Sequence, residues 1–192
     1  MRENIVRQTF RLILEKGLDA ISISDIQKAA SVSRALIYHY FSNKDELLID
    51  AVKTYLLLRY RLNEDNSAKM TVMELIKHTI KVYHSIEKEL LIDSDSKKIA
   101  MENYNGIFYQ SLRRYSVIKE MFGEYFREFE HVIKNGQKSG EIRKDLSSQY
   151  IARLILYVFD GGTNYLPYVV KNYNFYADTK KEMMNLYATI KA

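Results

Sequence analysis

The chain has 192 residues, with 29 Lys and Arg against 24 Asp and Glu and no cysteine. This length can bury a hydrophobic core without covalent cross-links, and the lack of cysteine excludes a disulfide framework and a Cys-based zinc site. One proline and seven glycines are few for a fold of turns and hairpins, so the leading fold class is all-α.

The N-terminus carries charges and then enters a helical pattern directly, without the apolar stretch that a signal peptide needs. The longest apolar stretch, residues 150–158, is interrupted by Arg153, so we expect no membrane span and a cytoplasmic location. The net charge is +5, and its basic excess is densest in the first 62 residues, which is compatible with a polyanionic partner.

The first two predicted helices are short. Over residues 5–14 the apolar residues recur at three, four and seven positions, which predicts one buried helical face, and Gly17 is a normal helix end. Ser22 followed three residues later by Asp25 has the spacing of a capping box, so a second helix is expected from there through Ala30.

Two more helix starts follow. Ser33 is placed to cap a third helix over residues 34–40, and Asn43 with Glu46 repeats the capping arrangement for a fourth. We expect this fourth helix to reach residue 62 and to end in the polar stretch 63–69. Its predicted buried side consists of Leu47, Leu48, Ala51, Tyr55, Leu58 and Leu62.

The remaining sequence predicts longer helices. Thr71 with Glu74 begins one over residues 72–90, a shorter helix over 97–105 stops at Gly106, and a strongly periodic one over 118–133 breaks at residues 136–140. Residues 147–166, bent or ended by Pro167, and residues 175–190 supply the last two. About nine helices result, and we divide them into an N-terminal domain 1–46 and a C-terminal domain 47–192, with the fourth helix as the connecting element.

Residues 22–41 form a capped helix, a tight turn and a second short helix whose first turn is polar. This is the layout of a helix-turn-helix, in which the N-terminal residues of the second helix enter the major groove. Over about residues 5–50 the sequence resembles the TetR family of transcriptional regulators. The matching positions are Gly17, Ser22, Ile26, Ala30, Val32, Ser33, Tyr38, Phe41, Lys44 and Leu47.

The sequence departs from the family pattern at three positions. Ser31 stands where the turn usually has glycine, Gln27 where a small residue is usual, and Ala35 where many relatives have glycine. A non-glycine residue in a left-handed turn costs on the order of 1 kcal/mol, which a folded unit can absorb. We expect Gln27 to point to solvent or DNA.

The resemblance implies a homodimer that binds double-stranded operator DNA and is released, as a repressor, by a small, largely hydrophobic effector. Arg34 is long enough to contact guanine O6 and N7, whereas Ala35 and Leu36 offer apolar contact, for example to a thymine methyl group. At the positions where the resemblance places backbone contacts, hydroxyl and ammonium groups and helix N-termini suit phosphate oxygens. The residues assigned to these contacts are Ser22, Ser24, Lys28, Ser33, Tyr38, His39 and Lys44.

Each aromatic residue of the motif also has a structural interpretation. We assign Phe41 to the core, and Tyr38 to DNA because its hydroxyl can reach a phosphate. His39 fits both a phosphate contact and a simple solvent-exposed position.

The effector is expected in the C-terminal domain, where most of the tyrosines and phenylalanines lie. Apolar helix faces carrying tyrosine hydroxyls suit a mostly hydrophobic ligand, although each of these residues alone fits the core equally well. The candidates are Tyr83, Met101, Tyr104, Phe108, Phe122, Tyr125, Phe126 and Phe159. Met101, Tyr104 and Phe108 are placed on the short helix and its exit.

The last two helices are expected to join the two subunits, since they carry more apolar residues than one core-facing stripe requires. The predicted interface residues are Ile151, Ile155, Val158, Tyr165, Met183, Tyr187 and Ile190.

Enzyme chemistry has no support in the sequence. It contains no nucleophile elbow and no phosphate-binding glycine loop, and the four histidines do not form a metal pair at i, i+4. We therefore expect no catalytic residue, metal or cofactor. One alternative from another class stays open, a helical interaction or ligand-carrier module whose helix-turn-helix no longer binds DNA. Arg34 and Lys44 argue against it.

Overall fold

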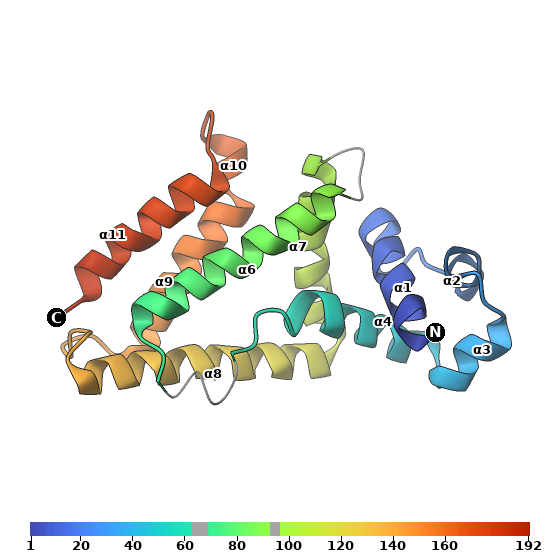
Figure 1. Cartoon of the computed structure of the whole chain (residues 1–192), viewed down its shortest axis with the longest axis horizontal. Helices are drawn as coiled ribbons and strands as arrows, with labels where there is room; N and C mark the ends of the chain where they lie inside the picture. The colour runs from blue at the N-terminus through green and yellow to red at the C-terminus, as the bar shows by residue number, and fades with distance from the viewer. Residues whose placement is uncertain (63–68, 93–96) are drawn as a thin grey trace. The chain divides into compact units, whose positions relative to one another are not determined.

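The computed structural model describes residues 1–62, 69–92 and 97–192, and the described residues form ten α-helices (Figure 1). No helix in these ranges is long and apolar enough to cross a membrane. The chain divides into two compact units, which we treat separately. The first unit comprises Met1–Arg61 and Glu89–Phe122, and the second comprises Leu62–Lys88 and Gly123–Ala192. The all-α prediction is confirmed.

The first unit is organised around α1 (Arg2–Lys16), which packs against α2 (Ile23–Ala30), α4 (Lys44–Val52) and α7 (Lys97–Arg114). The helix α3 (Arg34–Tyr40) contacts α2. The predicted caps are present. Ser22 and Asp25 form a complete capping box, and Ser33 and Asn43 accept hydrogen bonds from Leu36 and Glu46. The predicted boundaries of α2 and α3 are therefore confirmed.

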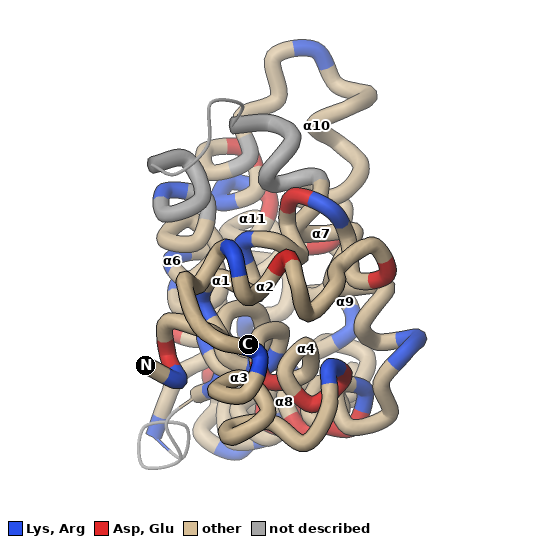
Figure 2. Tube along the Cα trace, turned by 90° about the vertical axis from the view of Figure 1, so that its right-hand side faces the viewer, with Lys and Arg blue, Asp and Glu red and all other residues tan. Residues whose placement is uncertain are grey.

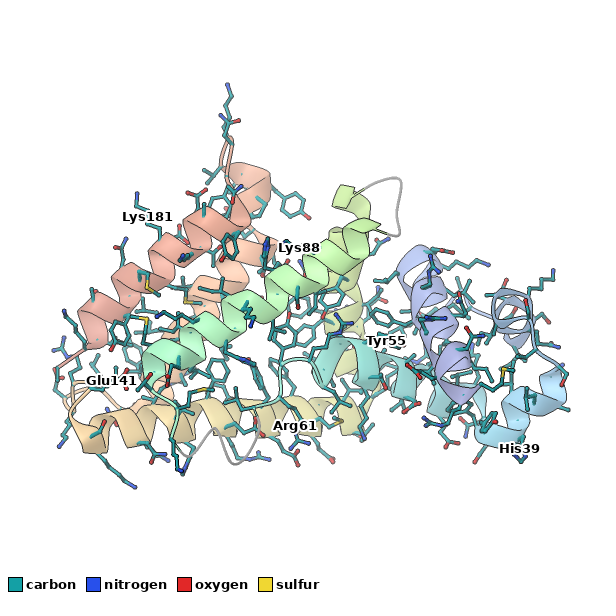
Figure 3. All side chains as sticks on the ribbon, in the orientation of Figure 1. His39, Tyr55, Arg61, Lys88, Glu141 and Lys181 are labelled. Atoms are coloured by element: carbon teal, nitrogen blue, oxygen red, sulfur yellow. The ribbon has the colours of Figure 1, made fainter. Side chains whose placement is uncertain are left out.

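The predicted fourth helix is wrong beyond Val52. A π-helical turn, Lys53–Leu57, follows α4. Because a π-helical turn has more residues than an α-helical turn, the side chains after Val52 no longer point where α-helical periodicity predicts. Leu56 and Leu57 are consequently buried, whereas Leu58 is 40% exposed. Tyr55 is half-buried and stacks on Phe10, with ring centroids 5.3 Å apart (Figure 3). The element is not one continuous α-helix to Leu62, and residues 63–68 of the predicted polar stretch lie outside the described residues.

The prediction that a helix stops at Gly106 is also wrong, because α7 continues through this glycine to Arg114. Glycine within a helix costs only about 1 kcal/mol relative to alanine. The buried residues Tyr104, Ile107 and Ser111 on the same helix outweigh that cost. Tyr104 and Phe108 therefore lie on a single helix rather than on a helix and its exit.

The second unit contains most of α6 (Val72–Ile92) and α8 (Ser116–Ser139), together with α9 (Ser148–Asn164), the short α10 (Leu166–Val169) and α11 (Lys180–Ile190). A second π-helical turn, Phe175–Thr179, precedes α11. The predicted Thr71–Glu74 start of α6 is confirmed by hydrogen bonds in both directions. Pro167 lies in the first turn of α10, directly after α9 has ended.

The predicted break at residues 136–140 is confirmed, because α8 passes through Gly136 and ends at Ser139. A Cβ atom at Gly136 would lie 2.9 Å from Val72 Cγ2, so the glycine allows α8 to approach the start of α6 closely. The helix ends three residues later, before Gly140 at φ +84°.

Glu141 then joins three segments of this unit. Its carboxylate accepts hydrogen bonds from the amides of Val72 and Met73 and from the Tyr187 hydroxyl, at 3.0, 3.2 and 3.0 Å (Figure 3).

Gly162 fixes how closely α9 approaches the second π-helical turn. A Cβ atom at this position would lie 2.2 Å from Thr179 Oγ1 and 3.0 Å from the Tyr173 hydroxyl oxygen. Those two hydroxyls are hydrogen-bonded to each other at 2.9 Å, and Thr179 is fully buried. Neither group can move away without breaking this bond.

We predict that Gly162→Ala lowers the free energy of unfolding by about 1–3 kcal/mol, because overpacking outweighs the gain in helix propensity. The matched control is Gly106→Ala, where no atom lies within 4 Å of the added Cβ. Urea titration followed by circular dichroism measures both variants. The packing argument is contradicted if Gly162→Ala is as stable as the Gly106→Ala control.

Candidate functional site

The helix-turn-helix is built from α2, a turn at Ser31 and α3. Ser31 adopts the left-handed conformation, with φ 55° and ψ 47°, so the departure from glycine is accommodated without a change of backbone path. Ile26 and Ala30 of α2 and Ile37 of α3 are buried. These three residues hold the two helices together and leave the opposite side of α3 exposed.

The first turn of α3 presents its polar side to solvent. Ser33 accepts a hydrogen bond from the Leu36 amide at 3.1 Å, which fixes the start of the helix. Arg34 and Ala35 are exposed and Leu36 is half-buried. The Arg34 guanidinium lies over the Tyr38 ring, 5.5 Å from its centroid. Sequence reasoning missed this contact, although the i, i+4 spacing of the two residues could have indicated it.

The remaining predicted contact residues are also accessible. Tyr38 is 41% exposed and His39 is exposed at the outer side of α3 (Figure 3). Ser24 and Lys28 are exposed on α2. Figure 2 views the chain from the side on which α2 and α3 lie, with the charged positions coloured. The structure thus presents these groups on one helical pair, while their contacts with DNA stay a prediction.

Besides Ser33, two predicted residues already make internal hydrogen bonds. The Ser22 hydroxyl donates to Asp25 Oδ2 at 2.6 Å and accepts from the Asp25 amide at 3.1 Å, so its proton is engaged in the cap. Hydrogen bonds from Lys16 and from Ser22 hold the pKa of Asp25 well below its ordinary value. Lys44 is half-buried and donates from Nζ to the Ile21 carbonyl at 3.0 Å.

Phe41 is 2% exposed, as the core assignment expects, and it has a further partner that sequence reasoning did not identify. The Arg2 guanidinium lies 5.1 Å from the centroid of its ring and also pairs with Asp50 at 2.9 Å. No motif signals this contact, because Arg2 precedes the family pattern.

The predicted effector residues fall into both units. In the first unit, Phe108 packs edge-on against Phe122 with centroids 4.9 Å apart, and Tyr104 is buried with its ring edge-on to Phe10 at 6.4 Å. The side chain of Met101 lies outside the described residues.

In the second unit, Tyr83 packs at right angles to Phe159, with centroids 5.4 Å apart. Tyr125 packs on Phe129, and burial raises the pKa of its hydroxyl. Phe126 is half-buried. These contacts describe two aromatic groups, and an effector site stays a prediction.

A groove of about 260 Å³ lies in the first unit between the end of α1 and the middle of α7. Asn103 crosses it and donates to the Leu14 carbonyl at 2.7 Å. None of the predicted effector residues lines this groove. Within the described part of the chain, no three His, Cys, Asp or Glu side chains could hold a metal ion together.

The interface prediction is wrong at four positions. Ile151, Ile155, Met183 and Ile190 are at most 1% exposed in the single chain, so they belong to its own core. Their periodic spacing marks the face on which α9 and α11 pack together.

The other three interface residues differ from one another. Val158 and Tyr187 are half-buried, whereas Tyr165 is 63% exposed. The exposed side of α9 also carries Tyr150 and Tyr157, which sequence reasoning did not select.

Residues 5–51 match the sequence model of the family described as bacterial regulatory proteins, tetR family. The chain is 29% identical over 161 residues to the uncharacterized HTH-type transcriptional regulator YvdT of Bacillus subtilis, covering 80% of this chain and 76% of the relative. It is 26% identical over 157 residues to the fatty acid metabolism regulator protein of the same organism, covering 81% and 78%.

The fold as a whole is also shared. The crystal structure of FadR from Bacillus subtilis in complex with stearoyl-CoA superposes with a TM-score of 0.75 at 23% identity, covering 99% of this chain and all of FadR. The helix-turn-helix match, the two regulators aligned over most of the chain and the common fold agree with one another. Residues 5–51 therefore form the DNA-binding domain of the TetR family, and the chain as a whole has the fold of a transcriptional regulator of this type.

Proposed function

We propose that this regulator is a cytoplasmic repressor without catalytic activity, which binds its operator as a homodimer and dissociates when a small, largely hydrophobic effector binds. The observation that carries the proposal is the exposed first turn of α3, where Arg34 extends over Tyr38. A cytoplasmic location follows because operator DNA is found there in bacteria.

In this proposal Arg34 reads a base and its neighbours define the register. The guanidinium makes a bidentate contact with guanine, and Ala35 and Leu36 contact a thymine methyl group. The Tyr38 ring supports the Arg34 side chain, and its hydroxyl reaches a phosphate. The other phosphate contacts come from Ser22, Ser24, Lys28, Ser33, His39 and Lys44, of which Ser22 contributes only through the N-terminus of α2, because its hydroxyl and its amide both donate to Asp25.

Selection of duplexes from a random library tests the proposal, since the operator sequence is not needed in advance. The expected result is a palindromic sequence whose half-sites are spaced by about one or two DNA turns, roughly 34–36 Å each. Binding of the selected duplex is expected to weaken steeply as salt rises, because phosphate contacts release counterions. Selection of no sequence at all would overturn the proposal.

Arg34→Ala is expected to abolish base preference at one position of each half-site, at a cost of about 1–3 kcal/mol of discrimination, and to leave the fold intact because the residue is exposed. Lys44→Ala should instead weaken binding to all sequences alike and reduce the salt slope by about 1. Fluorescence anisotropy with the selected duplex and single-base variants measures both. An Arg34→Ala protein that keeps wild-type selectivity contradicts the assignment.

The proposed dimer forms through the exposed side of α9. Tyr150, Tyr157 and Tyr165 lie seven and eight residues apart, which places them along one side of the helix and its end. They are 43%, 64% and 63% exposed. Tyrosines are enriched at protein interfaces because a large apolar ring and a hydroxyl can both find partners there.

Tyr157→Asp is expected to convert the dimer to a monomer and to lower operator affinity by more than about tenfold, because two half-site contacts would no longer act together. Val117→Asp is the matched control, since Val117 is 41% exposed in the first turn of α8, where an acidic residue is favourable. Sedimentation velocity reports the oligomeric state. A dimeric Tyr157→Asp protein would exclude this face.

The proposed effector is largely hydrophobic because the candidate residues are aromatic and because FadR, which shares the fold, is solved with stearoyl-CoA. Repression requires that the effector binds the DNA-incompetent state more tightly. A 100-fold preference corresponds to a coupling of about 3 kcal/mol, and the operator must then weaken effector binding by the same factor.

Stearoyl-CoA is the first probe, with choline as a polar control. We expect the acyl compound, and not choline, to raise the melting temperature and to release the selected duplex. Isothermal titration with and without this duplex should give effector affinities that differ by the factor seen in DNA release. Equal affinities in the two titrations rule out an effector-released repressor for this compound.

A further inference from the structure

Four side chains connect the C-terminal end of α7 to the loop before α2 and to the first turn of α4. Arg114 forms ion pairs with Asp19, in the loop between α1 and α2, and with Asp45 on α4, the latter at 3.1 Å. The neighbouring Tyr115 donates from its hydroxyl to Asp45 Oδ1 at 3.0 Å, and the Arg114 guanidinium lies 5.2 Å from the centroid of its ring. We call Arg114, Tyr115, Asp19 and Asp45 the α7 brace.

The brace joins two helix N-termini that are far apart in sequence. Asp19 precedes the Ser22 cap of α2, and Asp45 lies in the first turn of α4, directly after Lys44. The same two segments are also linked by the hydrogen bond from Lys44 to the Ile21 carbonyl. The ends of α2 and α4, both of which are assigned to phosphate contacts, are thus held to each other and to α7.

The contacts of the brace orient side chains but add little to the free energy of folding. The Asp19 side chain is 90% exposed, that of Asp45 57% and that of Arg114 33%. Ion pairs this exposed contribute little to folding. Tyr115 is different, because it is 7% exposed and delivers its hydroxyl to Asp45 from the core. The Arg114 guanidinium, which contacts both carboxylates, and the buried Tyr115 therefore orient Asp19 and Asp45 at the surface.

We propose that Arg114 and Tyr115 are positioning residues for operator binding: they hold the N-termini of α2 and α4 at the spacing that lets both contact the DNA backbone. The proposal rests on the DNA contacts proposed above. Neither residue touches a base in it, and the brace acts on affinity rather than on sequence preference.

The decisive variant is Asp45→Asn, because two explanations predict opposite signs. If the aspartates act only through charge, removing one near a polyanion strengthens binding. If the brace positions the helix ends, losing the Arg114 ion pair and weakening the Tyr115 hydrogen bond lowers operator affinity despite the more positive charge. Tyr115→Phe removes the hydroxyl alone and leaves the charge of the protein unchanged.

The experiment measures anisotropy of the duplex that the wild-type protein selects, using the full chain. We expect Arg114→Ala, Asp45→Asn and Tyr115→Phe each to weaken binding about 3- to 10-fold, the range for one hydrogen bond or exposed ion pair lost from a positioning contact. Base preference and melting temperature should stay close to wild type. The matched controls are Arg113→Ala and Glu120→Gln, both exposed and outside the brace, and they should change affinity less than twofold beyond their charge effect.

Hydrogen exchange supplies a readout that needs no DNA. Arg114→Ala and Tyr115→Phe should speed exchange of the amides in residues 17–22 and 43–46, whereas Arg113→Ala should not. Tighter binding by Asp45→Asn, or Arg114→Ala behaving as Arg113→Ala in both measurements, would falsify the brace. If the wild-type protein selects no duplex but the exchange result holds, the proposed function fails while the brace as a structural device stands.

Discussion

The recognition helix α3 has only seven residues, fewer than an isolated helix needs to persist in water, so its conformation depends on contacts with the rest of the first unit. Ile37 supplies the main contact, because it is the buried residue of α3, with 1% of its surface exposed. α3 packs against α2, where Ile26 is also buried, and α2 in turn packs against α1. The polar groups of α3 that are offered to DNA therefore depend on this small apolar contact and on the Ser33 cap.

Because the apolar contact is small, hydrogen bonds and ion pairs set much of the orientation of the helices in the first unit. The Ser22–Asp25 box fixes the start of α2, Lys44 ties α4 to the segment before α2, and the brace ties both to α7. Hydrogen bonds and ion pairs are directional in a way that hydrophobic contact is not. A surface that must match the spacing of a DNA groove uses this property.

Local signals in the sequence were sufficient for the DNA-binding part. Capping at Ser22, Ser33 and Asn43 involves residues within three positions of one another, so the pattern alone predicts the helix starts. Features that depend on distant partners were not visible in the sequence. Gly136 marks the predicted end of α8, but the pattern does not reveal that this glycine also admits Val72, which is 64 positions away. The prediction that Leu58 is buried is wrong because a π-helical turn changes the helical period after Val52. No residue type in the sequence indicates such a turn.

The interface prediction failed for a different reason. Helical periodicity identifies an apolar face but does not tell whether the covering surface belongs to the same chain or to a second copy. At Ile151 and Met183 the cover comes from the same chain. Exposed tyrosines such as Tyr157 are available to a second copy, but in the sequence they are indistinguishable from core aromatic residues.

The hydrogen bond from Lys44 to the Ile21 carbonyl makes the two lysines assigned to phosphate unequal. A free lysine side chain has about 2 kcal/mol of rotamer entropy, part of which is lost when a partner orders it. For Lys44 this ordering takes place when the protein folds, and its ammonium group keeps two further N–H donors for a phosphate. Lys28 is exposed on α2, and DNA has to order its side chain on arrival. At equal charge, the proposed phosphate contact of Lys44 therefore uses a preoriented cation and loses less side-chain entropy than the proposed contact of Lys28.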